Sequence, residues 1–223
     1  MKRVLEICTG NIESVIAAAK AGAERIELCS ALDVGGVTPS LGMMQWTHST
    51  FPELKVQLLI RSRGGNFVYD KADLETMLID IREALPYVNG IVCGALTNEG
   101  DIDIEALRLM MAAANGKPVT FHRAFDRCCD PKKALEQLID AGCTRILTSG
   151  HESSAEKGIH LLRELIEQAG DRIIIMPGGG VTTINARMIV DQTGCKEIHG
   201  SFSAGTGITS TEAVKQVLAI IAR

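Results

Sequence analysis

Residues 4–29, VLEICTGNIESVIAAAKAGAERIELC, contain two short apolar segments on either side of a helix-like segment. Val4–Cys8 and Arg25–Cys29 alternate aliphatic with charged or sulfur side chains, as strands with one buried face do. Between them, Ile12–Lys20 has the apolar spacing of a helix, and Gly22 follows where a left-handed C-cap residue is favoured. The stretch therefore predicts one strand–helix–strand unit.

The same alternation continues along the chain and gives eight strand–helix units. The further predicted strands are Val56–Arg61, Gly90–Cys93, Val119–His122, Arg145–Thr148, Arg172–Met176 and Glu197–Gly200. The further predicted helices are Leu41–His48, Leu74–Leu85, Ile104–Ala114, Pro131–Ala141, Ala155–Ala169, Ile184–Asp191 and Thr211–Ala222. Eight units in 223 residues fit a lean (β/α)8 TIM barrel, whereas a doubly wound open sheet usually has fewer strands. Because no linker interrupts the pattern, we predict an α/β fold with one TIM-barrel domain over residues 1–223.

The composition argues against several classes of protein. A formal charge of −4 without a run of basic residues provides no positively charged surface for binding nucleic acid. With only 4% aromatic residues, the chain also lacks the aromatic side chains on which bases stack. No apolar stretch approaches the roughly 18 residues of a membrane span, and the early acid Glu6 argues against a signal peptide. The seven cysteines are an odd number without a CxxC pair, which is typical of reduced thiols. We therefore expect a cytoplasmic protein that binds neither nucleic acid nor membranes.

Alternation along the predicted strands places charged side chains inside the barrel. In the first strand, Leu5 and Ile7 form the helix-facing side, so the residues between and after them point inward. The same reasoning gives a polar interior that contains Glu6, Arg25, Glu27, Arg61, His122, Glu197 and His199. Buried ions are costly unless they are paired, and we interpret Arg25, Arg145 and Glu197 as a structural network. Polar residues at the carboxyl ends of the strands are candidate site residues, because active sites of this fold lie there.

The first two strands carry a near-repeat, LEIC over residues 5–8 and IELC over residues 26–29. Equivalent positions in neighbouring strands lie roughly 5 Å apart, so Cys8 and Cys29 are expected to face each other at the barrel mouth. Glu6 and Glu27 are then expected one layer below. A pair of soft thiolates is a suitable ligand set for Cu(I). The alternative, which explains each cysteine alone equally well, is a small apolar side chain buried in the core. The remaining cysteines take that second interpretation: Cys93, Cys128, Cys129, Cys143 and Cys195.

Four polar residues at the strand ends are candidate catalytic residues. Repulsion between Glu6 and Glu27 is expected to raise the pKa of one of them and to make it a general acid or base. Arg61 either stabilises charge or neutralises both carboxylates. His122 is expected to titrate in the useful pH range. A carboxylate–histidine pair of this kind serves proton abstraction beside a carbonyl, although a histidine at a strand end is often purely structural.

Three consecutive glycines follow the seventh predicted strand: Gly178, Gly179 and Gly180. Loops seven and eight of this fold frequently bind phosphate, so exposed backbone N–H groups here predict an anion site. His199 and Ser201, at the end of the eighth strand, are expected to contribute to it. Arg63 and Arg123 are the candidate cations for binding the substrate, with a surface salt bridge as the alternative for Arg63.

Five segments together resemble a known family: RIELC (25–29), GGVTPS (35–40), TFHRAFD (120–126), RILTSG (145–150) and MPGGG (176–180). Through them the sequence resembles the CutC family of copper homeostasis proteins over nearly its whole length. The resemblance implies a single TIM barrel, a cytoplasmic location, a homodimer and a role in copper handling. It also implies that Cys8 and Cys29 are the Cu(I) ligands.

The chain departs from the common CutC pattern at Ser62, Asn66 and Cys93, where the family usually has Pro, Asp and Phe. Two main functions follow from the sequence. The first is a copper homeostasis protein that binds Cu(I) through the cysteine pair. The second is a TIM-barrel enzyme of lyase or isomerase type that acts on a small anionic or phosphorylated substrate without an organic cofactor. A passive binding scaffold is a third.

Overall fold

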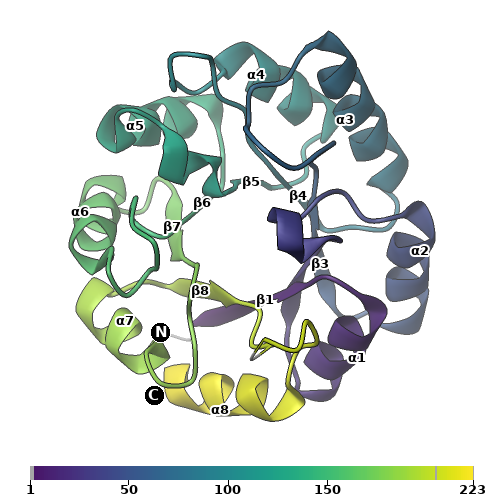
Figure 1. Cartoon of the computed structure of the whole chain (residues 1–223), viewed down its shortest axis with the longest axis vertical. Coiled ribbons are helices and arrows are strands. Elements are labelled where there is room, and N and C mark those ends of the chain that lie inside the picture. Colours follow the sequence, from purple (N-terminus) through teal and green to yellow (C-terminus); the bar gives the residue numbers. More distant parts are fainter. Residues whose placement is uncertain (1–2, 204, 223) are drawn as a thin grey trace.

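A ring of parallel strands forms the inside of the molecule and helices surround it (Figure 1). The computed structural model describes residues 3–203 and 205–222, so Met1, Lys2 and the extreme ends of the predicted domain 1–223 lie outside it. Within the described residues, eight strands make one sheet in the order β7-β6-β5-β4-β3-β2-β1-β8, and β7 lies beside β8. The predicted TIM barrel is confirmed.

The strands and helices alternate along the chain as predicted. The strands are β1 (Val4–Thr9), β2 (Arg25–Leu28), β3 (Lys55–Leu59), β4 (Gly90–Cys93), β5 (Val119–Phe121), β6 (Arg145–Thr148), β7 (Ile174–Pro177) and β8 (Glu197–Gly200). The helices are α1 (Ile12–Lys20), α2 (Leu41–Thr50), α3 (Lys71–Ala84), α4 (Ile104–Ala113), α5 (Pro131–Ala141), α6 (Ile159–Ala169), α7 (Ala186–Thr193) and α8 (Thr211–Ile221), with short 3-10 helices η1 (Leu32–Val34) and η2 (Arg123–Arg127).

Several element boundaries differ from the prediction by one to four residues, and three of them bear on the argument. Helix α3 begins three residues early, because the Asp70 side chain accepts a hydrogen bond from the backbone of Asp73 and caps it. Helix α6 begins late, because the preceding turn donates a backbone hydrogen bond from Ala155 to Gly179 and packs over the loop after β7. Strand β3 ends at Leu59, two residues before the predicted Arg61, which therefore lies in the following loop.

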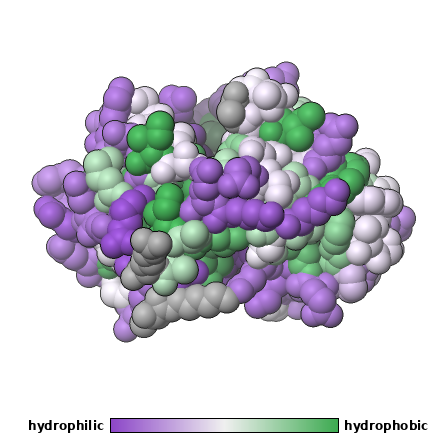
Figure 2. Space-filling model, turned by 90° about the horizontal axis from the view of Figure 1, so that it is seen from below, coloured by the Kyte–Doolittle hydropathy of each residue, from purple (hydrophilic) through white to green (hydrophobic). Residues whose placement is uncertain are grey.

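The outer side of the strand ring is apolar and packs against the helices. Ile7, Ile26, Leu58, Ile91 and Phe121 are all fully buried on this side. No helix among residues 3–203 and 205–222 is long and apolar enough to cross a membrane. The face of the molecule shown in Figure 2 carries hydrophilic side chains with scattered hydrophobic ones between them.

The inner side of the ring contains a buried network of charges. Arg25 on β2 pairs through Nε with Glu6 on β1 at 2.7 Å and through Nη2 with Glu197 on β8. Arg145 on β6 pairs with the same Glu197 at 2.7 Å. Glu197 and Arg25 are both nearly inaccessible to solvent, so burying either ion without a partner would cost several kcal/mol. The pairing offsets this free energy of desolvation. The predicted pairing of Arg25 and Arg145 with Glu197 is confirmed.

We predict that Arg25→Met lowers the free energy of unfolding by about 3–5 kcal/mol, since it leaves Glu6 and Glu197 buried without this partner. Arg163→Met is the matched control, because Arg163 forms an exposed pair with Glu167 at 3.9 Å and such pairs contribute little. Urea unfolding of both variants at pH 7 measures the difference. Equal, small losses in the two variants would show that the interior network does not stabilise the barrel.

Candidate functional site

A cavity of about 700 Å³ opens at the carboxyl ends of the strands. Its wall combines residues from β1, β2, β3, β6 and β8 with the loops that follow β2, β3, β5, β7 and β8. Small-molecule sites in proteins commonly have volumes of this order, about 300–1,000 Å³. The candidate residues that line it are Cys8, Glu27, Cys29, Arg61, His122, Arg123, Gly179, Gly180, His199 and Ser201.

The two candidate copper ligands lie together on the floor of this cavity. Cys8 Sγ and Cys29 Sγ are 3.8 Å apart, and both side chains are buried. Their backbone positions are not paired as the sequence predicted, because Cys8 pairs with Glu27 in the sheet register. Neighbouring strands of a barrel are staggered, and the sulfurs therefore meet diagonally.

Glu27 completes a group of three donors around one point. Its carboxylate oxygen and the two sulfurs all lie within 4.8 Å of one another, and the three residues are buried. Leu59 and Val92 pack against the thiols from the neighbouring strands and form a small apolar cluster with them. Cys8, Cys29 and Glu27 thus form a compact, partly apolar set of possible metal ligands.

His199 separates the two glutamates that the sequence placed side by side. Its Nδ1 lies 3.0 Å from Glu6 Oε1, and its Nε2 lies 3.6 Å from Glu27 Oε2. Burial alone would raise the pKa of Glu6, but the hydrogen bond with His199 and the charge of Arg25 lower it. Burial is the main cause that raises the pKa of Glu27, whereas the charge of Glu6 contributes less. The expected repulsion between the two carboxylates is therefore a minor effect.

The same contacts fix the charge of His199. Burial alone would lower the pKa of its imidazole, but hydrogen bonds with Cys8 and Glu6 and the charge of Glu27 raise it well above its ordinary value. The hydrogen bond with Cys29, followed by burial, raises the pKa of the Cys8 thiol. At neutral pH the floor of the cavity therefore holds an imidazolium between two carboxyl groups, next to the protonated thiol of Cys8.

Arg61 organises the loops of the mouth instead of pairing with the glutamates. Its guanidinium donates to the backbone carbonyls of Val34 at 3.0 Å, Gly36 at 2.9 Å and Gly65 at 2.8 Å. It also lies over the ring of Phe67, 4.8 Å from the centroid. The alternative in which Arg61 neutralises both glutamates is therefore wrong, and Arg61 holds the loops after β2 and β3 together.

Arg63 lies outside the cavity wall. It pairs with Asp73 at 2.8 Å and donates to the carbonyl of Val68 at 2.7 Å. With 41% of its side chain exposed, it matches the surface salt bridge that was the alternative to substrate binding.

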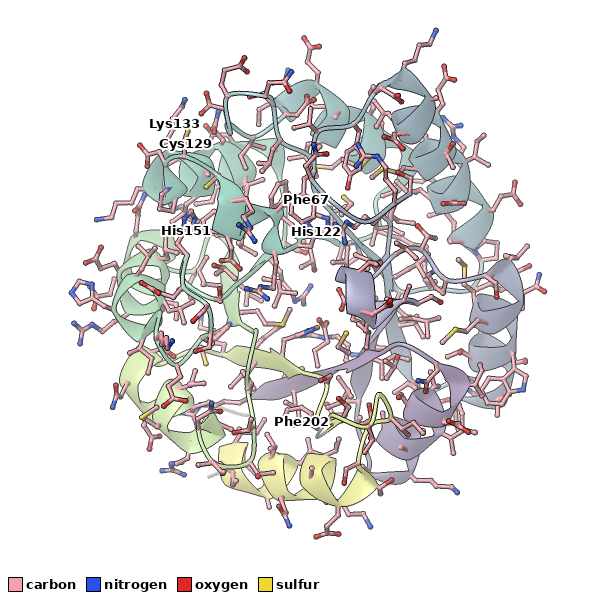
Figure 3. The ribbon with its side chains drawn as sticks, viewed as in Figure 1. Phe67, His122, Cys129, Lys133, His151 and Phe202 are labelled. Carbon is pink, nitrogen blue, oxygen red and sulfur yellow. The ribbon has the colours of Figure 1, made fainter. Side chains whose placement is uncertain are left out.

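His122 follows β5 and is held in one orientation on the cavity wall. Its Nδ1 accepts a hydrogen bond from the backbone of Ala124 at 3.2 Å, and its ring lies tilted against that of Phe67 with centroids 5.0 Å apart (Figure 3). A Cβ atom on Gly94 would lie only 2.7 Å from this Nδ1, so the close approach requires glycine there. Burial, with the charge of Arg61, lowers the pKa of His122 to about 3. The prediction that His122 titrates near neutral pH is therefore wrong, and its imidazole stays neutral.

The three glycines after β7 differ in whether they are available to a ligand in the cavity. The N–H of Gly178 donates to the carbonyl of Thr148 at 2.9 Å and is not available to a ligand. Gly179 and Gly180 have φ values of +95° and +73° and line the cavity. The guanidinium of Arg123 packs on this loop, 3.1 Å from where a Cβ atom on Gly179 would lie. Gly179 therefore permits an arginine to lie directly over the backbone.

Asp126 is the site residue that sequence reasoning missed most clearly. It accepts hydrogen bonds from Arg123 Nε at 2.8 Å and from the backbone of Ser149 at 3.0 Å, so it joins the loops after β5 and β6. Phe67 and Phe202 were also missed as cavity-lining residues. Asp126 lies in the segment TFHRAFD, and its position three residues after an arginine was the available signal. Cys129, expected to be buried, is exposed.

Comparison with known proteins gives consistent results. The profile of the CutC family matches residues 3–204. The family protein CutC of Parabacteroides distasonis is 47% identical over 202 residues, which cover 90% of this chain and 83% of that protein. The copper homeostasis protein cutC homolog of Homo sapiens is 47% identical over 199 residues, which cover 89% of this chain and 72% of that protein. The crystal structure of CutC from Streptococcus agalactiae superimposes with a TM-score of 0.85 at 38% identity, covering 89% of this chain and 98% of that one.

We predict that His122 makes the protein less stable as the pH falls from 6.5 towards 3. In this range the unfolded chain takes up a proton on His122 and the folded protein does not, so acidification favours unfolding. From pH 7.5 to pH 5, the wild-type protein should lose about 2 kcal/mol more than His122→Asn, which keeps an acceptor for the Ala124 N–H. Urea unfolding at several pH values measures this, and parallel pH profiles would contradict a neutral His122.

Proposed function

Because the chain belongs to the CutC family of copper homeostasis, we propose that it binds Cu(I) between Cys8 and Cys29 on the floor of the cavity. The observation that supports this most directly is the 3.8 Å separation of the two sulfur atoms in a chain whose described cysteines are all free. Thiolates are the soft ligands that Cu(I) prefers. Copper is here the cargo of the protein.

The separation of the sulfurs suits a single bound ion. With Glu27 as a third ligand in a trigonal arrangement, two sulfurs that each lie about 2.3 Å from one ion are about 4.0 Å apart, close to the 3.8 Å between Cys8 Sγ and Cys29 Sγ. The strands therefore need no movement to bring both thiolates to one metal. Leu59 and Val92 limit access of water on the inner side, while the cavity leaves the outer side open for entry and release of the ion.

The charges around the thiols also favour a monovalent cation. Two thiolates and one Cu(I) together carry one negative charge, and the protonated His199, which also faces Glu6 and Glu27, offsets part of it. Metal binding requires both thiols to lose their protons, and the charge of the ion makes this favourable. The carboxylate oxygen of Glu27, within reach of the same point, is a third donor that holds the ion or receives one of the two displaced protons.

The acid–base function remains the second candidate, with fewer residues than the sequence suggested. Glu6 is engaged by Arg25 and His199, and Arg61 is engaged by backbone carbonyls. Of the four predicted catalytic residues, this leaves Glu27, which faces His199, and His122, whose Nε2 has no hydrogen-bond partner among the described residues. The cytoplasmic location and the homodimer also stay predictions, and the free thiols are consistent with a reducing compartment.

We predict that the reduced protein binds one Cu(I) per chain and that Cys8→Ser and Cys29→Ser each weaken binding by more than about 100-fold. Changing a residue that only hydrogen-bonds to a metal ligand lowers metal affinity by about 10–100-fold, and removal of a ligand itself should lower it further. Cys195→Ser is the control, because Cys195 is a buried free thiol outside the cavity wall. Anaerobic competition with a chromophoric Cu(I) chelator gives the affinities. Equal affinities in all four proteins would contradict the proposal.

We predict a much smaller effect of Glu27→Gln, less than about tenfold in Cu(I) affinity, because sulfur supplies most of the binding energy for a soft ion. The same chelator competition measures it. A loss as large as that in Cys8→Ser would mean that the carboxylate is a required ligand and would favour a harder cation than Cu(I).

A further inference from the structure

The cavity above the cysteine pair is much larger than one copper ion requires. Its volume of about 700 Å³ extends from the thiols to the loops after β5, β7 and β8. Figure 3 shows His122 near β5 and Phe202 near α8, on opposite sides of the barrel opening. The part of the wall between them holds polar groups that copper binding does not use.

His122 presents a hydrogen-bond donor without an acceptor. Since its Nδ1 accepts from the N–H of Ala124, the neutral ring carries its proton on Nε2. This Nε2 is buried and has no hydrogen-bond partner in the described part of the chain, although the side chain lines the cavity. An unmet buried donor lowers stability, so an oxygen acceptor that reaches Nε2 from the cavity would be stabilised by this hydrogen bond.

The loop after β7 presents a second set of donors. Within residues 3–203 and 205–222, the N–H groups of Gly179 and Gly180 have no hydrogen-bond partner. Arg123 lies against this loop, with Nη1 3.1 Å from the position of a Cβ atom on Gly179. Asp126 and Ser149 hold the guanidinium in place through Nε and Nη2. Two backbone donors and the Nη1 end of a guanidinium that is ion-paired with Asp126 therefore lie at one corner of the cavity.

These donors suit a phosphate group better than an uncharged one. A phosphate presents several acceptor oxygens and pairs well with guanidinium and backbone N–H groups. The acidic residues of the cavity wall are Glu27, on the floor beside the thiols, and Asp33, in η1. Neither belongs to the loop after β7, where phosphate sites of TIM barrels commonly lie.

We propose that the barrel mouth binds a small phosphorylated carbonyl compound, with its phosphate on Gly179 and Gly180 beside Arg123 and its carbonyl oxygen on Nε2 of His122. None of these four residues belongs to the proposed copper site. Metal-free protein is therefore sufficient to test ligand binding, and failure of one proposal leaves the other unaffected.

The test is isothermal titration calorimetry of the reduced, metal-free protein at constant ionic strength. Inorganic phosphate probes the glycine corner alone, and dihydroxyacetone phosphate probes the corner and His122 together. We expect saturable binding of both, with dihydroxyacetone phosphate tighter by about tenfold, as one further hydrogen bond to a buried donor allows. Malonate at the same ionic strength should bind more weakly than phosphate.

Variants separate the two ends of the site. Gly179→Ala places a methyl group against Arg123 and should weaken phosphate binding by at least about tenfold. Gly22→Ala is the matched control, because Gly22 has a similar φ of +85° with open space around it, so it reproduces the backbone strain alone. Arg123→Lys keeps the charge and removes the planar fork, and it should also weaken phosphate binding. His122→Asn should leave phosphate affinity unchanged and abolish the preference for dihydroxyacetone phosphate.

Three results would overturn the proposal. Phosphate heats that do not saturate, or that are the same in Gly179→Ala, Arg123→Lys and wild type, would exclude the glycine corner. Malonate binding as tightly as phosphate would show that the corner takes anions without preference for phosphate. A preference for dihydroxyacetone phosphate that is absent in the wild type, or survives in His122→Asn, would remove His122 from the site.

Discussion

The ion pair between Arg25 and Glu6 inside the barrel is the interaction on which the cavity floor depends. Arg25 also holds Glu197, so one guanidinium joins β2 to both β1 and β8. Glu6, fixed in this way, accepts the hydrogen bond that orients His199 towards Glu27 and Cys8. A barrel filled with aliphatic side chains would avoid the cost of burying these ions. The charged layer therefore serves to position the groups above it.

Much of this arrangement could be predicted from the sequence, because it follows from local periodicity. The alternation of Leu5 and Ile7 with polar neighbours places Glu6 and Cys8 inside the barrel, and eight such strands define the fold. The grouping of the two cysteines at the carboxyl end follows from the same pattern. The stagger between β1 and β2, which pairs Cys8 with Glu27, depends on closure of the whole ring and leaves no local signal.

The properties that sequence reasoning missed depend on contacts between distant segments. Arg61 binds carbonyl groups of the loops after β2 and β3. Because every residue type has a backbone carbonyl, the sequence contains no signal for these contacts. The neutral state of His122 results from burial beside Phe67 and Arg61, which lie more than fifty residues away in the chain. The glycines of the loop after β7 were visible in the sequence, but that Gly178 is engaged by Thr148 was not.

The cavity thus has a soft, sulfur-containing floor and a polar rim that bears N–H donors, and copper binding concerns the floor alone. X-ray absorption at the copper edge of the Cu(I)-loaded protein tests this assignment most directly, because it counts the atoms bound to the metal. Binding between Cys8 and Cys29 predicts two sulfur neighbours per copper, with no more than one oxygen or nitrogen neighbour. A copper surrounded by oxygen and nitrogen only would contradict a Cu(I) site at the cysteine pair.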